Sequence, residues 1–168
     1  AVVESVAVIP GDLVEDQVWM IVQRNIGGTT KRFVEFLMPY DFGSDVEDAF
    51  FVDSGLTYDG AAATSVSGLG HLEGQVVTVL ADGAAHPTKT VSSGAITLDR
   101  SAQKVHVGLG YNSTLKTMRL EAGSQDGTSQ GKLKRIHDIT LRLFKTVGAK
   151  IGPSVAGTDI IPFRSSAD

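Results

Sequence analysis

The chain has 168 residues, of which 42% are hydrophobic and 20% are charged, and its formal net charge at pH 7 is −4. This composition is sufficient for a folded core and excludes a disordered chain. The net negative charge gives no support to a nucleic-acid-specific site, which needs clustered lysine and arginine. The absence of cysteine excludes disulfides, cysteine-zinc sites and thiol chemistry. The length favours one domain or two small ones.

Three apolar runs at the beginning of the chain predict an antiparallel β-meander. The first, 2–9, ends at a Pro-Gly turn, and the second, 17–24, carries β-branched residues on both faces. The third, 31–38, alternates in strand fashion after a glycine-containing turn. The sequence does not begin with the residue pattern of a signal peptide. We expect it to be a piece of a longer chain.

Residues 39–63 are interpreted as the crossover between this meander and a second sheet. The part 39–49 is acidic and irregular. The short apolar runs 50–52 and 56–58 each end at a turn signal that contains glycine, and small residues follow at 61–63.

Short strand-like runs separated by tight turns predict the second sheet. The run 75–81 is followed at once by Asp82-Gly83, a strong hairpin signal because glycine adopts positive φ without steric cost. Serine, glycine and aspartate turns separate the later runs, which are 88–91, 95–98 and 104–109. Regularly spaced short strands of this kind are typical of a small antiparallel barrel or sandwich.

The last part of the chain is divided into a loop and further strands. Residues 121–132 predict a flexible surface loop. Residues 133–150 fit both helical and strand spacing, and their β-branched residues and the glycine breaks near their end favour a strand. Residues 160–163 predict an edge strand or an interface segment.

The predicted fold class is therefore mainly β: an antiparallel small barrel or sandwich built from short strands and hairpins, with a second β-meander. We expect the barrel-like domain over 59–125. The second meander is expected to form from 1–58 and 133–168, packed together. No apolar run approaches the ~20 residues that a membrane-spanning helix needs.

Few residue constellations could carry chemistry. The four histidines lie far apart without ligand spacing, so we expect ordinary polar positions, no metal site and no cofactor. The glycines at 68, 70 and 74 have the wrong spacing for a phosphate-binding loop, and a strand rather than a helix follows them. Turn and close-packing roles are expected for these glycines. The histidines are His71, His86, His106 and His137.

Several phrases that together span nearly the whole chain resemble a phage family. They are VWMIVQRNIGGTTKRFVEFL, AFFVDSGLTYDG, SGLGHLEGQVVTVLADGAAHPTKTVSSGAITLD, KVHVGLGYNSTLKTMRLE, KRIHDITLRLFKTVGAKIGPS and PFRSS. The chain resembles the C-terminal part of the β-rich tail proteins, tail tubular or nozzle-like, of tailed phages and prophages. The resemblance implies a virion component of the tail that is assembled in the cytoplasm of the bacterial host. It implies partners that are other copies of the chain and neighbouring tail proteins, and it supplies no catalytic residues.

Assembly into a ring requires two different surfaces on each copy, because heterologous contacts generate closed rings. From charge sign, we expect a basic flank on one side and an acidic segment on the other. The basic flank is Lys132, Lys134 and Arg135, and the acidic segment contributes Asp41, Asp45, Glu47 and Asp48.

Two other functions stay open at this point. A host-surface or carbohydrate-binding β-domain needs an exposed aromatic platform, for which Trp19, Tyr58 and Tyr111 are the candidates, although core burial is expected for Trp19. A polysaccharide-degrading tail enzyme needs two converging carboxylates. No nucleophile motif accompanies the acids, and solvated loop positions are favoured for them. The candidate carboxylates of such an enzyme are Asp41, Asp45, Asp53 and Asp59.

Overall fold

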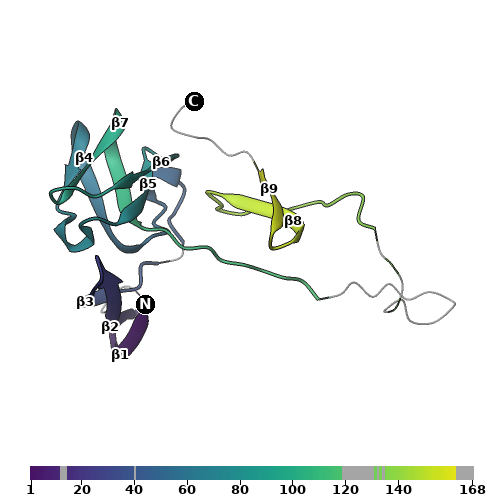
Figure 1. Ribbon diagram of the computed structural model, residues 1–168, viewed down its shortest axis with the longest axis horizontal. Coiled ribbons are helices and arrows are strands. Elements are labelled where there is room, and N and C mark those ends of the chain that lie inside the picture. Colours follow the sequence, from purple (N-terminus) through teal and green to yellow (C-terminus); the bar gives the residue numbers. More distant parts are fainter. Residues whose placement is uncertain (12–14, 40, 119–130, 132, 134, 162–168) are drawn as a thin grey trace.

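A computed structural model of the chain describes residues 1–11, 15–39, 41–118, 131, 133 and 135–161 (Figure 1). The fold is mainly β, and every strand pairing in it is antiparallel, which confirms the predicted fold class. The described strands form three sheets, with the orders β1-β2-β3, β4-β7-β5-β6 and β8-β9. Two single-turn 3₁₀ helices, η1 (Val46–Asp48) and η2 (Gly70–Leu72), lie in the connections.

The first sheet is the predicted meander. It contains β1 (Val2–Ile9), β2 (Gln17–Ile26) and β3 (Thr29–Phe36), paired in chain order. Its strands alternate as the sequence indicated, so that one face turns toward the second sheet and the other turns away from it.

The second sheet holds the core of the molecule. It contains β4 (Asp53–Ser67), β5 (Val76–Ala81), β6 (Ala84–Thr90) and β7 (Ala95–Leu109). Alternate side chains of β5 and β7 point inward and are almost fully buried, as the period of two requires. The predicted hairpin turn at Asp82-Gly83 joins β5 to β6, and both of its residues have positive φ, 49° and 74°.

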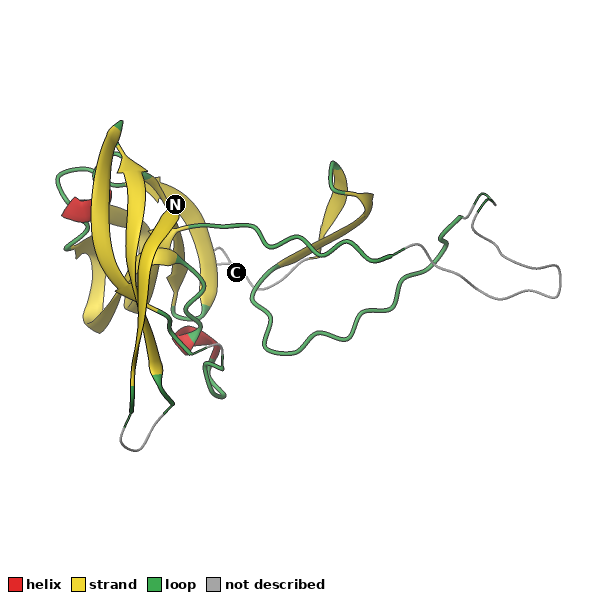
Figure 2. Cartoon of the chain, turned by 90° about the horizontal axis from the view of Figure 1, so that it is seen from below, coloured by secondary structure: helices red, strands yellow, loops and turns green. Residues whose placement is uncertain are grey.

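The second sheet curls but is not closed into a barrel, and the arrangement is sandwich-like, as Figure 2 shows. The first half of β7 approaches β6 through side chains. The backbone N–H of Asp99 donates to His86 Nε2 at 3.0 Å, and Lys89 forms an ion pair with Asp99. His86 is buried at this approach of β6 to β7, and its Nδ1 donates to the carbonyl oxygen of Pro87 at 2.8 Å.

The stretch around η2 covers one end of the core. Leu69 and Leu72 are completely buried, and the carboxylate of Glu73 accepts hydrogen bonds from the backbone N–H groups of Ser93 and Gly94, at 2.9 and 2.7 Å. The glycines on either side of this turn, at 68 and 74, have φ of 91° and 73°. They are turn glycines, as the sequence predicted.

The crossover predicted over 39–63 was wrong for residues 53–63, because β4 is a strand of 15 residues that begins at Asp53. It pairs with β7 along its length, with register shifts between Asp59 and Ala63 and between Ala63 and Ser65. The Asp-Gly and small-residue signals therefore mark irregularities in one strand rather than its end. The predicted domain boundary between 58 and 59 falls inside β4. Likewise, the predicted strands 95–98 and 104–109 are parts of the single strand β7.

The expected meander of N- and C-terminal segments is also corrected. Strands β8 (Ala149–Ser154) and β9 (Gly157–Ile161) pair with each other in a two-stranded sheet, and neither is part of the first sheet. Residues 135–148 belong to no strand, so the strand predicted over 133–150 is limited to its last two residues in the part of the chain that the structure describes. The loop predicted over 121–132 lies outside the described residues, apart from Gly131.

Candidate assembly surface

The acidic segment that precedes β4 is fixed to the second sheet. The side chain of Lys104 on β7 forms an ion pair with Asp48, and Lys104 Nζ lies 3.8 Å from Asp59. The ring of His106 donates from Nε2 to the carbonyl oxygen of Glu47 at 2.8 Å. One predicted surface acid, Asp48, is thus already paired inside the chain.

The ring of His106 is held in one tautomer by two partners. Because Nε2 donates to a carbonyl oxygen, Nδ1 carries no proton and accepts from the hydroxyl of Thr57, at 2.8 Å. Burial lowers the pKa of His106 below its ordinary value of 6.5, with the nearby ammonium group of Lys104 acting in the same direction. The histidine is therefore a neutral structural link between β7, β4 and η1.

A second cation meets the acidic segment from the C-terminal part of the chain. Lys145 forms an ion pair with Asp41, and its ammonium lies 5.7 Å from the ring centre of Phe42. This hydrogen bond from Lys145 and a second one from the backbone N–H of Gly43 hold the pKa of Asp41 below its usual value. Sequence reasoning placed the positive partner at 132–135 and missed Lys145, whose sequence context gives no sign of the contact.

The remaining two predicted acids border a depression of about 610 Å³. Asp45 and Glu47 line it together with the hairpin turn Asp82-Gly83 and with Thr146 and Val147. The depression therefore lies where the acidic segment, the β5–β6 turn and the C-terminal segment meet. Neither Asp45 nor Glu47 forms an ion pair within the described part of the chain.

Of the predicted basic flank, only Arg135 falls in the described part of the structure, where it is exposed. Lys132 and Lys134 lie outside the described residues. Arg135 opens a segment, 135–144, that carries further positive charge at Arg142 and apolar side chains at alternate positions.

Exposed apolar side chains line β1, which is an edge strand of the first sheet. All eight residues of β1 are exposed, and among the described strands β1 pairs only with β2. The valines at 6 and 8 are 57% and 58% exposed, and Ile9 is 49% exposed. An unpaired, apolar strand edge is a template for pairing with another chain.

The face of the first sheet that turns away from the core is apolar as well. Trp19 and Phe36 are neighbours across β2 and β3 with ring centres 5.1 Å apart, and Ile21 lies beside Val34 in the same register. Val34 is 70% exposed and Phe36 is 43% exposed. The expected core burial of Trp19 was wrong, because Trp19 lies on this outward face and is half-buried against Phe36.

The opposite face of the first sheet is tied to the second sheet by a polar network. Arg24 on β2 contacts both carboxylate oxygens of Glu35 on β3, and its Nη1 lies 3.4 Å from Asp53 on β4. The hydroxyl of Ser54 donates to Glu35, and His71 Nε2 donates to the carbonyl oxygen of Ser54 at 2.8 Å. This network links the two sheets, and no residue spacing in the sequence predicted it.

The candidate catalytic acids are distributed over this structure. Asp53 belongs to the Arg24 network, Asp41 is paired with Lys145, and Asp59 lies on β4 with its side chain 70% exposed. No hydrogen bond in the described ranges joins two of the four candidates. Among the described residues no group of three or more His, Asp or Glu side chains is placed to hold a metal ion. No described helix is long and apolar enough to cross a membrane.

The sequence was also compared with known proteins. No protein-family model matches the chain, and no curated protein matches it.

Proposed function

We propose that this chain is a structural domain of a tailed-phage or prophage tail protein, which acts through assembly and not through catalysis. Its partners are other copies of itself and neighbouring tail proteins, in the virion tail. The observation that carries the assembly role is the unpaired β1 edge, where every residue is exposed and five of eight are valine or isoleucine. The tail setting rests on the sequence phrases quoted above.

The physical argument is the cost of leaving such a surface in water. Burying apolar surface contributes about 25 cal/mol per Å². Exposed apolar side chains are concentrated on the first sheet and on the segment 136–144, and others are distributed over the rest of the described chain. Contiguous apolar surface on a soluble domain marks an interaction site.

Sedimentation of the chain over a concentration series tests this proposal. We expect reversible self-association that is weakened by Val8→Lys, which puts a charge on the β1 edge and leaves the buried core intact. Val155→Lys is the matched control, because Val155 is also exposed, at 69%, but lies in the β8–β9 turn. A chain that stays monomeric at all concentrations, or that associates equally well with Val8→Lys, would contradict the proposal.

A host-surface or carbohydrate-binding domain is the second candidate. The observation that favours it is the half-exposed Trp19–Phe36 pair, since an aromatic surface on a rigid sheet is a platform on which a sugar ring can stack. A glycan-array screen of the chain and its Trp19→Ala variant tests it. Binding that is lost with Trp19→Ala would favour this function over assembly.

A further inference from the structure

The segment 138–143 has the pattern of a β-strand but pairs with no strand in the described part of this chain. Its sequence, Asp-Ile-Thr-Leu-Arg-Leu, alternates polar and apolar residues. Ile139, Leu141 and Leu143 are 54%, 45% and 48% exposed. A single extended strand leaves its backbone groups to water and its apolar side exposed, and pairing with another strand would cover both.

The chain offers an acceptor of the same length and character. Residues 5–9 of β1 pair with β2 in unbroken register, from Ser5 opposite Ile21 to Ile9 opposite Gln17, and no described strand pairs with their other edge. The usual protections of an edge strand are weak here: β1 has one charged residue, Glu4, which is held by Arg32, and the only irregularity of its pairing precedes Ser5.

We propose that residues 138–143 of one copy add as an antiparallel strand to the β1 edge of a second copy. This rests on the proposed assembly function and gives its mode. With Leu141 opposite Ala7, Ile139 lies opposite Ile9 and Leu143 opposite Ser5. Residues opposite each other share a face, so the three apolar side chains of the donor extend the outward face that carries Trp19.

The charges agree with this direction of the donor strand. In the antiparallel alignment, Arg135 continues past Ile9 toward the β1–β2 connection, which carries the exposed acids Glu15 and Asp16. The parallel alignment would place Arg135 at the other end of β1. Opposite charges at the rim of an interface favour one register and speed association.

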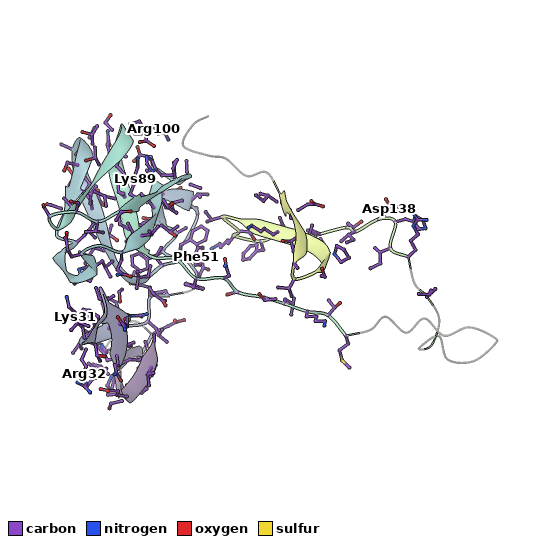
Figure 3. The ribbon with its side chains drawn as sticks, viewed as in Figure 1. Lys31, Arg32, Phe51, Lys89, Arg100 and Asp138 are labelled. Atoms are coloured by element: carbon purple, nitrogen blue, oxygen red, sulfur yellow. The ribbon has the colours of Figure 1, made fainter. Side chains whose placement is uncertain are left out.

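The donor segment is directed away from its own β1. Lys145, two residues after the end of the segment, forms an ion pair with Asp41 of the same chain. Figure 3 shows Asp138 well away from Lys31 and Arg32 of the first sheet, and residues 138–143 belong to none of the three described sheets. A second copy is therefore the partner to which this geometry offers the strand.

Cysteine cross-linking tests the proposal cleanly, because the chain has no cysteine of its own. An Ala7→Cys chain is mixed with a size-tagged Leu141→Cys chain and oxidised, and the products are separated without reductant. We expect the mixed disulfide between positions 7 and 141 to be the main product. A mixture of Val155→Cys chains with size-tagged Leu141→Cys chains is the control. In it we expect no mixed disulfide, here between positions 155 and 141, as a main product.

The other outcomes separate this inference from the proposed function. The chain could associate and yet form disulfides mainly between two copies of position 7, or form no mixed disulfide. Either result would overturn strand donation and leave the assembly function standing. A 7–141 link formed inside the Ala7→Cys/Leu141→Cys double variant while it sediments as a monomer would also overturn it. A chain that neither associates nor cross-links would overturn both.

A backbone test complements the cross-link. Thr140→Pro removes an N–H from the middle of the donor strand, and we expect it to weaken self-association by about tenfold or more. Ser113→Pro, in the other exposed non-strand segment, is the matched control and should leave association unchanged. Equal association of both variants would contradict strand donation.

Discussion

Arg24 and Glu35 form a two-point ion pair across β2 and β3, with Nε to Oε1 at 3.0 Å and Nη2 to Oε2 at 2.8 Å. The side chains are only 10% and 16% exposed. The same two residues reach Asp53 and Ser54 at the beginning of β4, so the pair joins the first sheet to the second. These contacts between the two sheets hold the outward face and the β1 edge in position for a partner.

Removing one partner of this pair should destabilise the fold. Arg24→Met leaves the carboxylate of Glu35 partly buried without its cation, and we expect a loss of about 3 kcal/mol in the free energy of unfolding. The double variant Arg24→Met/Glu35→Met should be more stable than Arg24→Met alone, because it leaves no unpaired charge. Urea unfolding followed by circular dichroism measures both. Additive losses in the double variant would show that the two side chains do not interact.

The free energy of unfolding should decrease as the pH is lowered, because His106 is neutral in the folded protein. Burial lowers its pKa in the folded state, while the unfolded chain binds a proton at about 6.5, the ordinary value. The stabilising contribution is thus fully present above pH 6.5 and is lost as the pH falls through the lowered folded pKa. Thermal unfolding of the chain and of His106→Gln at pH 7.5 and 5.5 checks this. The variant should lose part of the pH dependence, and His137→Gln, at an exposed position, should retain all of it.

Truncation of two neighbouring valines on β5 should destabilise the fold to very different degrees. Val77 is fully buried and Val76 is 61% exposed. We expect Val77→Ala to cost about 2 kcal/mol in the free energy of unfolding, from lost burial and the cavity it leaves, and Val76→Ala to cost less than about 0.5 kcal/mol. Chemical denaturation of the two variants gives the comparison. Similar losses at both positions would mean that β5 does not alternate between core and solvent as described.

The sequence predicted the parts of the fold that depend on local signals. The alternation in β2 and β3, the β5–β6 hairpin at Asp82-Gly83 and the turn glycines near η2 are all confirmed. These features follow from side-chain period and from the steric freedom of glycine, which neighbouring residues alone decide.

The parts that the sequence did not predict depend on distant partners. Residues 98–101 of β7 contain turn-forming residues, yet the strand continues past them, and its pairing with β4 passes from Ala63 opposite Ala102 to Ser65 opposite Thr97. The carboxylate of Asp82 further supports β7 by accepting from the backbone N–H groups of Gln103 and Lys104. The contact of Lys145 with Asp41, 104 residues earlier in the chain, is likewise invisible to any local pattern.

Hydrogen exchange at two protein concentrations tests the central claim of assembly through β1 most directly. Strand pairing between copies hydrogen-bonds backbone amides that are free in one copy, so exchange should slow in residues 5–9 and 138–143 when the concentration rises. Val76 and its neighbours on β5 should be unaffected, since their ladders form within one chain. Concentration-dependent protection of both segments is the predicted result. Fast exchange of both segments in a chain that sedimentation shows to be associated would contradict the account.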